Sequence, residues 1–329
     1  MGDMIAVKPP VEKPEQGEEQ LAGNNAMRES VKIEFAVDEN KILQVLLTID
    51  QEYKSRKLEE KAERIHNKIE KRKATRLPRL KKLMKNENRE EKIRETVRKA
   101  AELVLTEEET KEALRELEVI ELSPFILMLG LGGSHLTGTI TSTEFSSAHE
   151  AGHYIHYFVM KKAVENGTSK DPVLNSLHEK VTELGYGFDE TWVLLKSYSR
   201  QNSAEEKKSL FTYWEFTEAV AETFATHLEH GMAYEVLSDF GCLQPHYWGA
   251  LVASWPLKKV LEENPEQFRE LLEQPSLVIG SSTYEIAKQI KEQMGLTEIE
   301  LAKEWFNTFF LPAITIYDKK EAGENPYTN

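Results

Sequence analysis

The sequence SSAHEAGHYIHYF, residues 146–158, carries two histidines four residues apart, His149 and His153, with Glu150 directly after the first. Four residues are slightly more than one helical turn, so both imidazoles leave one face of a helix and can bind one metal ion. Glu150 lies beside them, where it can accept a proton from an attacking water molecule. The helical pattern continues to about Glu165. We therefore predict a metal-binding helix of the HExxH type that holds one Zn²⁺ per chain.

A catalytic zinc site takes three ligands from the protein and keeps one position open. The segment Trp214–Glu229, WEFTEAVAETFATHLE, has a helical pattern, and Glu215, Glu218 and Glu222 share one stripe of it. We predict Glu218 as the third metal ligand, since gluzincin-type enzymes take a glutamate from a later helix. Glu222, one turn further on, is expected to accept a hydrogen bond from a ligand imidazole and so fix its tautomer.

Other interpretations of these residues stay open. An ordinary helix can bury two histidines without a metal ion, and the acidic stripe can be a solvated surface. His227 and His230 offer an all-histidine ligand set. His156 completes the pattern H-E-x-G-H-x-x-H and is expected to line a pocket or to pack, while Gly152 permits another segment to approach the helix closely.

The rest of the chain predicts a mainly α fold of the α+β class, with a small sheet beside the HExxH helix. Short strands are predicted at Val31–Val37, at Ser123–Gly133 with its turn, and at His135–Thr143. Helices are predicted at Asp171–Leu184, Asp189–Ser199, Ala204–His230, Gly249–Glu263, Pro265–Glu273, Thr283–Met294 and Thr297–Phe309.

The N-terminal third differs in composition from the remainder. Residues 1–30 are rich in Pro, Glu and Gly and predict a flexible tail, and residues 31–120 predict an arm of long charged helices. Within the arm, Lys54–Lys99 holds 19 basic and eight acidic residues, in a chain of net charge -14. The arm can be a solvated or coiled-coil surface, a lid, or the contact of a homo-oligomer. Nucleic acid is not an expected partner, because no Phe, Trp or Tyr follows Tyr53 within the arm to stack on bases.

Composition limits the classes of protein to which the chain can belong. Hydrophobic residues make up 40% of it, enough for a sizeable core. Cys242 is the only cysteine, which excludes an internal disulfide and a Cys-rich metal site. The longest apolar run, Phe125–Leu131, is far shorter than the roughly 20 residues needed to span a bilayer. We therefore expect a cytoplasmic protein that does not enter the membrane.

Residues 146–158 closely resemble the active-site helix of the thimet oligopeptidase and oligopeptidase F family of zinc peptidases, whose signature is H-E-x-G-H-x-x-H. Pro124–Met128 is similar to the family's strand before that helix, which pairs with the substrate backbone. Phe216–Ala219 is similar to the segment with the family's glutamate ligand, and residues 249–272 resemble its C-terminal helical stretch. The resemblance implies a zincin-like metallopeptidase domain at residues 121–329 that acts on short or unfolded peptides.

Three departures accompany this resemblance. The interval between His153 and Glu218 is longer than in the family, so an insertion at Val164–Ser209 is expected to fold outside the metal site. The large N-terminal half that closes the family's channel is mostly missing. The family's late His and Tyr, which steady the oxyanion, are matched only in part, and the resemblance gives that role to His246 or Tyr247.

The function expected from these features is zinc-dependent hydrolysis of peptide bonds with Glu150 as the general base. One alternative is a catalytically inactive relative that holds a metal ion or a peptide. Another is a protein that binds polyanions or protein partners through its basic helices.

Overall fold

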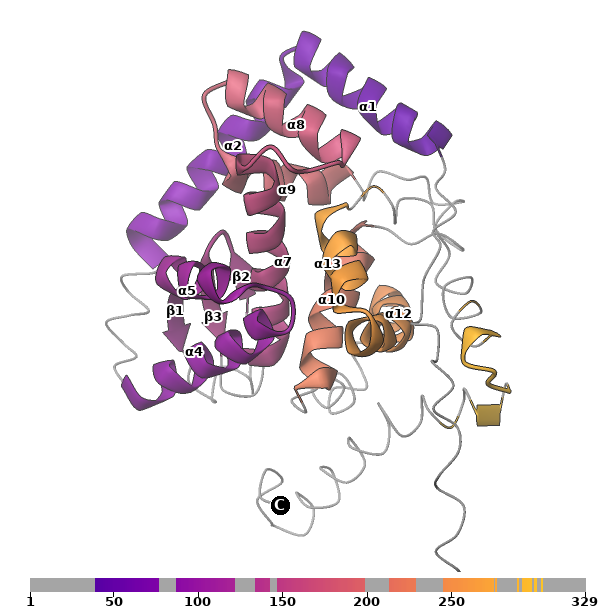
Figure 1. Ribbon diagram of the computed structural model, residues 1–329. Coiled ribbons are helices and arrows are strands. Elements are labelled where there is room, and N and C mark those ends of the chain that lie inside the picture. Colours follow the sequence, from indigo (N-terminus) through magenta and orange to yellow (C-terminus); the bar gives the residue numbers. More distant parts are fainter. Residues whose placement is uncertain are drawn as a thin grey trace, which may run out of the picture. The chain divides into compact units, whose positions relative to one another are not determined.

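The computed structural model describes residues 39–76, 87–121, 134–142, 147–198, 213–228 and 245–274, with residue 276 and a few positions between 289 and 303. All of them belong to one compact unit, Val31–Asn329. This part of the chain is mainly helical with one small sheet, as predicted (Figure 1). The expected tail, the strands at Val31–Val37 and Ser123–Gly133, and most of the helices expected after residue 283 lie outside the described residues.

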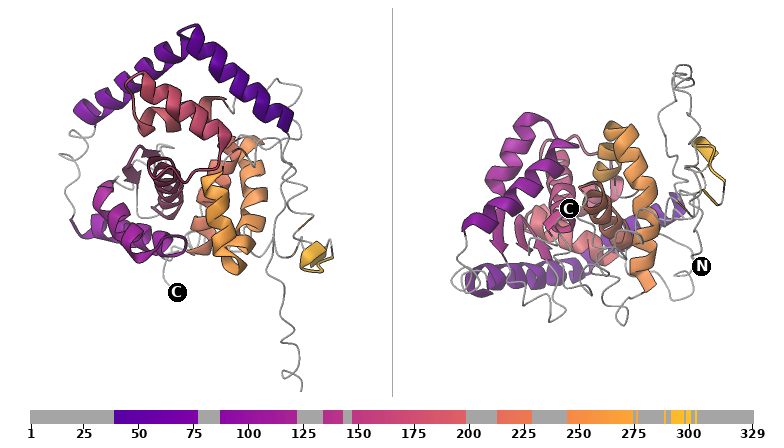
Figure 2. Two further views of the ribbon diagram at one scale, coloured as in Figure 1. Left: turned by 45° about the horizontal axis from the view of Figure 1, so that its top comes forward. Right: turned by 90° about the horizontal axis from the view of Figure 1, so that it is seen from below.

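The HExxH segment forms the central helix α7, Ser147–Glu165, and its predicted end is confirmed. Every residue from Ser147 to Met160 is buried, because apolar side chains occur on all sides of the helix. The helices that flank it are α4 (Glu87–Glu102), α10 (Tyr213–His227), α12 (Pro245–Glu263) and α13 (Pro265–Glu273). α4 and the sheet pack on one side of α7, whereas α10 and α13 pack on the other and also contact α12 (Figure 2).

Within the described residues the sheet consists of β1 (Glu118–Glu121), β2 (Ser134–Leu136) and β3 (Thr139–Ser142), in the order β1-β3-β2. β3 runs parallel to β1 and antiparallel to β2. The single strand predicted at His135–Thr143 is therefore wrong. This segment is a hairpin whose two-residue turn, Thr137-Gly138, has φ angles of 46° and 75°. Glycine adopts such angles easily, but a β-branched residue rarely does, and the turn therefore has no clear sequence signal.

The N-terminal arm and the predicted insertion pack against each other. The arm supplies α1 (Glu39–Lys54) and α2 (Lys57–Lys71), and the insertion supplies α8 (Pro172–Glu183) and α9 (Phe188–Tyr198). α1 contacts α8, and α2 contacts α9 (Figure 1). Nδ1 of His66 on α2 lies 2.9 Å from Oε1 of Glu190 on α9, and the carboxylate is buried. Part of the arm is thus packed against the rest of the unit.

α5 (Glu107–Glu116) connects the first half of the chain to α13. Thr106 and Glu109 form a capping box at its start, which satisfies two backbone N–H groups. Arg269 of α13 donates two hydrogen bonds of 2.7 Å to the carboxylate of Glu109. This bidentate pair, the largest influence on the carboxyl, lowers the pKa of Glu109 to about 2.

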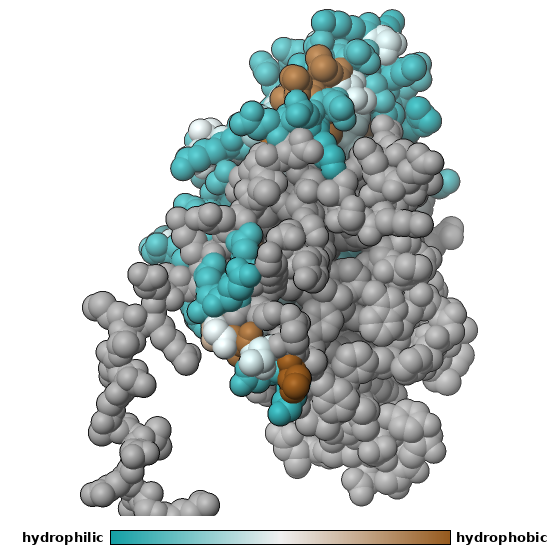
Figure 3. All heavy atoms as spheres, turned by 90° about the vertical axis from the view of Figure 1, so that its right-hand side faces the viewer, coloured by the Kyte–Doolittle hydropathy of each residue, from teal (hydrophilic) through white to brown (hydrophobic). Residues whose placement is uncertain are grey.

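The outer face of α1 carries two leucines one turn apart, Leu43 and Leu47, which are 54% and 51% exposed. Figure 3 shows a small hydrophobic patch among hydrophilic side chains over this helix. The subunit contact expected for the arm stays a prediction. None of the helices in the described part of the chain combines the length and the apolar character needed to cross a bilayer.

Candidate metal centre

α7 and α10 cross at Gly152 and Ala221. A Cβ atom on Gly152 would lie 2.7 Å from Cα of Ala221 and 3.0 Å from the ring of Phe224. Because glycine has no side chain at this position, the backbones of α7 and α10 can come this close. The close approach predicted for Gly152 is confirmed, and it turns the HExxH face of α7 toward the acidic face of α10.

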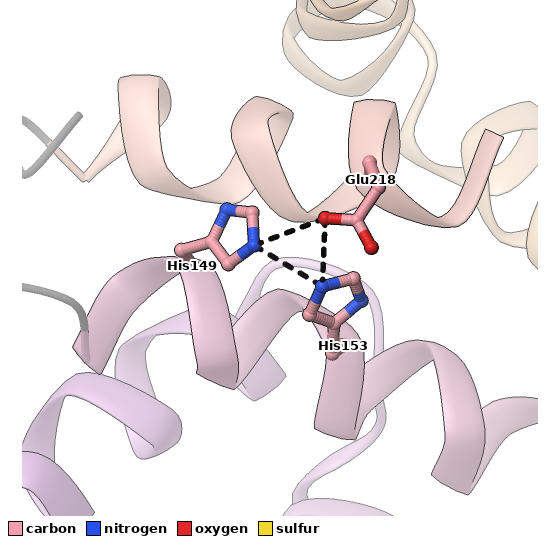
Figure 4. A group of neighbouring side chains, drawn as sticks. All are labelled: His149, His153 and Glu218. Carbon is pink, nitrogen blue, oxygen red and sulfur yellow. Dashed lines mark hydrogen bonds and ion pairs between the residues drawn. The ribbon is translucent and has the colours of Figure 1, made fainter. Parts of the chain in front are cut away.

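Three of the predicted metal ligands meet next to this crossing (Figure 4). Nε2 of His149 and Nε2 of His153 are 3.1 Å apart, and Oε2 of Glu218 lies 3.4 Å from the first nitrogen and 3.3 Å from the second. All three residues are buried, with exposed fractions of 3%, 7% and 7%. Two imidazoles from α7 and one carboxylate from α10 thus form a group that can hold a metal ion.

The spacing of these donor atoms fits a single ion. Zinc binds imidazole nitrogen and carboxylate oxygen at about 2.0–2.2 Å, and at that radius two tetrahedral ligands are about 3.3–3.6 Å apart. The donor atoms of His149, His153 and Glu218 are separated by 3.1 to 3.4 Å. Without an ion, two Nε2 atoms that face each other need a proton between them. The donor set therefore suits a cation, and the described residues supply three of the four ligands of a tetrahedral zinc site.

Burial and the carboxylates set the protonation of the site in the protein without an ion. Burial opposes a charged imidazole, yet Glu218 and Glu222 outweigh it and raise the pKa of His149 well above its usual value. At His153 burial dominates and lowers the pKa to about 4. Burial also opposes the charge of Glu218, but the two histidines hold the pKa of this carboxyl well below its usual value. A proton on His149 therefore stands where a metal ion would bind.

Glu222 orients the first histidine of the motif. Its Oε1 lies 3.0 Å from Nδ1 of His149, and its side chain is fully buried. When Nδ1 donates to this carboxylate, the lone pair of Nε2 is left for a metal ion. The hydrogen bond predicted for Glu222 is thus present. Glu150 is also buried, in the first turn of α7, and its role as a base stays a prediction.

Of the other predicted site residues, most have side chains outside the described residues, and His227 is paired elsewhere. His246 and Tyr247 lie in the first turn of α12, but their side chains are outside the described residues. The side chain of Glu215 and the whole of His230 are outside them as well. Nδ1 of His227 lies 3.7 Å from a carboxylate oxygen of Glu262 on α12, so His227 is paired away from the metal ligands.

His156 is a packing residue, one of the two roles predicted for it. Its ring is fully buried and stands edge-on to Trp192 and Phe216, with ring centroids 5.3 and 5.5 Å away. Burial lowers its pKa well below the usual value, so the ring is neutral.

α9 belongs to the insertion, and through Trp192 it packs directly against the metal-binding helix. The insertion was predicted to fold outside the metal site, and the contact of Trp192 with His156 on α7 was not predicted. The four-residue spacing of Phe188, Trp192 and Lys196 indicates that they share one face of α9, but it does not indicate which helix that face contacts.

The resemblance to zinc oligopeptidases rests on the motifs around His149 and Glu218. Comparison of the chain with protein-family models, with curated proteins and with solved structures finds no match.

Proposed function

We propose that this protein is a zinc-dependent peptidase of the gluzincin type that hydrolyses short or unfolded peptides. The observation that supports this function is the convergence of three donor atoms, on His149, His153 and Glu218, at separations of 3.1 to 3.4 Å. Two imidazoles, one carboxylate and an open position are the usual composition of a catalytic zinc site, whereas structural zinc sites fill all four positions with protein ligands.

Each residue has a distinct task in this proposal. When bound there, zinc supplies Lewis-acid chemistry, since it polarises a carbonyl group and lowers the pKa of water. Glu150 accepts the proton of the attacking water and passes it to the leaving amine. Glu222 holds His149 in the tautomer that presents Nε2. His246 or Tyr247, at the start of α12, is proposed to donate a hydrogen bond to the oxyanion.

The sheet supports a peptide as the substrate. Among the described strands, β2 pairs only with β3 and forms one edge of the sheet, and an edge strand can pair with an added extended segment. Both β2 and β3 contact α7. An extended peptide that pairs with this edge runs beside the helix that carries the histidines, which favours unfolded substrates over folded proteins.

The test combines zinc analysis with mass spectrometry of a peptide library after incubation with the purified protein. We expect cleavage products from the wild type and none from Glu150→Gln, which keeps its zinc because Glu150 is not a ligand. Glu165→Gln, in the last turn of the same helix, is the matched control and should cleave like the wild type. Equal turnover by Glu150→Gln would remove this residue from the mechanism. Zinc binding without any cleavage would instead indicate a metal- or peptide-holding protein.

A further inference from the structure

A cavity separate from the metal centre lies between the hairpin turn, α7 and the start of α9. Its volume is about 500 Å³, within the usual range of small-molecule sites. The end of α5, the turn Thr137-Gly138, one face of α7 and residues 187–190 line it. The metal ligands of α7 turn instead toward Glu218 on α10. The cavity is therefore a second site on the same helix.

Three aromatic residues line this cavity. The ring centroid of Tyr157 lies 6.5 Å from that of Tyr154 and 5.5 Å from that of Phe188. All three residues are at most 6% exposed, so packing holds their rings in place. Aromatic rings favour the apolar part of a ligand, and the negative potential of their faces also attracts cations.

The hydrogen-bond donors around the cavity are engaged within the protein. The hydroxyl of Tyr157 donates to Oδ1 of Asp189 at 2.5 Å, and that of Tyr154 donates to a backbone carbonyl of α5 at 2.6 Å. The backbone N–H of Gly187 donates to Glu190 at 3.0 Å. Burial and the charge of Asp189 raise the pKa of Tyr157, so its hydroxyl keeps the proton that it donates. A ligand thus meets mainly acceptor groups here.

Carboxylates also outnumber cations in the lining. Glu116, Glu165, Asp189 and Glu190 contribute four carboxylates, against the single ammonium group of Lys161. Nζ of Lys161 lies 2.9 Å from an oxygen of Glu116 and 3.9 Å from one of Glu165, so its charge is directed to these two groups. The cavity as a whole therefore favours a positive ligand over a negative one.

Asp189 is the carboxylate best placed to receive such a ligand. Its Oδ2 lies 3.4 Å from Nζ of Lys73, a long contact to a lysine whose side chain is 45% exposed, and such contacts are weak. A carboxylate can accept about four hydrogen bonds, and the short bond from Tyr157 uses only one. Both oxygens of the buried Glu190, by contrast, have partners within 3.0 Å.

We propose that this cavity binds an organic cation, with an ammonium, guanidinium or amidinium group on Asp189 and an apolar part against the aromatic residues. The cation comes either from a small molecule or from a Lys or Arg side chain of a peptide, because both present the same group. The inference goes beyond the proposed peptidase function and does not depend on it. Asp189 lies in the insertion, so the site belongs to the segment in which the chain departs from the family it resembles.

The first experiment compares three probes of nearly equal size and different charge. Benzamidine is a cation, benzamide is neutral and benzoate is an anion. Calorimetric titration of the purified protein should show that benzamidine binds about ten- to a hundredfold more tightly than benzamide, the usual effect of a charge-assisted hydrogen bond. Benzoate should bind more weakly than both. No binding of benzamidine, or equal affinity for benzamidine and benzamide, overturns the proposal.

Substitution of Asp189 locates the site. Asp189→Asn keeps the size of the side chain and an acceptor for Tyr157, and it should remove the preference for benzamidine over benzamide. Asp50→Asn is the matched control, because Asp50 also lies beside a lysine, Lys54 at 2.6 Å, but does not line the cavity. Thermal unfolding checks that each variant is folded. An unchanged preference in folded Asp189→Asn contradicts the proposal.

A second variant tests the same carboxylate from the opposite direction. Lys73→Met removes the cation that competes for Asp189 and should raise the affinity for benzamidine about two- to fivefold. Lys54→Met is its control and should change nothing, because Lys54 pairs with Asp50 on α1. Lys73 is exposed, so this variant should fold even if Asp189→Asn does not. Unchanged or weaker binding in Lys73→Met counts against Asp189 as the binding group.

Peptides distinguish the two sources of the cation. A short peptide with Arg and the same peptide with the uncharged citrulline are titrated into Glu150→Gln, so that cleavage does not consume them. Tighter binding of the Arg peptide, in competition with benzamidine, identifies a peptide side chain. Binding of benzamidine alone identifies a small molecule. Neither measurement requires turnover, so the cation site stands if the peptidase function fails, and cleavage without any cation binding has the opposite meaning.

Discussion

Oε1 of Glu222 lies 3.0 Å from Nδ1 of His149, and both side chains are buried. Nδ1 of His149 faces this carboxylate, so it carries a proton whether the ring is charged or neutral, and Nε2 points at Nε2 of His153, 3.1 Å away. The bond joins α10 to α7 one turn beyond Glu218. α10 thus contributes both a predicted ligand and the group that aligns another ligand.

Glu222→Gln tests this alignment. We expect zinc affinity to fall about 10- to 100-fold with little change in the fold, because the amide keeps the size of the carboxylate but loses its charge. Competition with a chelator measures the affinity. Glu262→Gln is the matched control, since Glu262 also faces a histidine of α10, His227, at 3.7 Å. An unchanged affinity in Glu222→Gln would show that His149 does not depend on this bond.

Glu218→Ala removes one of the three predicted ligands. We expect the purified variant to retain almost no zinc, because two imidazoles alone leave half of a tetrahedral site to solvent. Metal analysis after dialysis measures the loss, with His227→Ala as a control that leaves all three ligands in place. Full zinc content in Glu218→Ala would assign the third position to another residue.

Zinc binding should release a proton near neutral pH. Burial opposes the charged form of His149, but Glu218 and Glu222 outweigh it and raise the pKa well above its usual value, which favours the protonated imidazole in the protein without an ion. Zinc must displace that proton, and apparent affinity therefore falls as the pH decreases. Calorimetry in two buffers with different ionisation enthalpies measures the number of protons released. Identical heats in both buffers would contradict the raised pKa.

Gly152→Ala tests the helix crossing. Alanine favours a helix by about 1 kcal/mol over glycine, but here its methyl group would stand 2.7 Å from the Ala221 backbone. We expect a net destabilisation of about 1–3 kcal/mol, together with weaker zinc binding as α10 moves away. Urea unfolding measures the first effect. Gly187→Ala, whose new methyl group would meet its nearest atom at 3.8 Å, should stay within about 0.5 kcal/mol of the wild type.

Acid should weaken the contact between α5 and α13. Arg269 lowers the pKa of Glu109 from 4.5 to about 2 in the folded protein, so the pair stabilises the fold above pH 4.5 and this contribution is lost as the pH falls toward 2. Partial exposure screens the pair and limits the loss to about 1–2 kcal/mol. Denaturant unfolding at pH 6 and pH 3 measures it. Glu109→Gln should show a correspondingly smaller difference between the two pH values.

The local features of the site could be predicted from sequence, because they depend on helical periodicity. The four-residue spacing of His149 and His153 puts both rings on one face, and the same spacing gives Glu218 and Glu222 one stripe. Gly152 was a further signal, since glycine inside a helix favours close packing.

Features that depend on tertiary structure could not be predicted in this way. The turn at Thr137-Gly138 uses a β-branched residue with positive φ, which sequence rules disfavour. The contact of Trp192 with His156 joins two helices whose relative position is not encoded in any local pattern.

The crossing at Gly152 and Ala221 also determines when the ion can be captured. His153 precedes Glu218 by 65 residues, which corresponds to about 3–13 s of translation at the usual rates of synthesis. A growing chain therefore contains both imidazoles before Glu218 has been synthesised. α10 must then pack against Gly152 before the three donor atoms can come together. A metal ion that needs all three donor atoms would therefore bind only late in the synthesis and folding of this chain. Such an ion would join helices that had already packed together, and would not serve as the template for their packing.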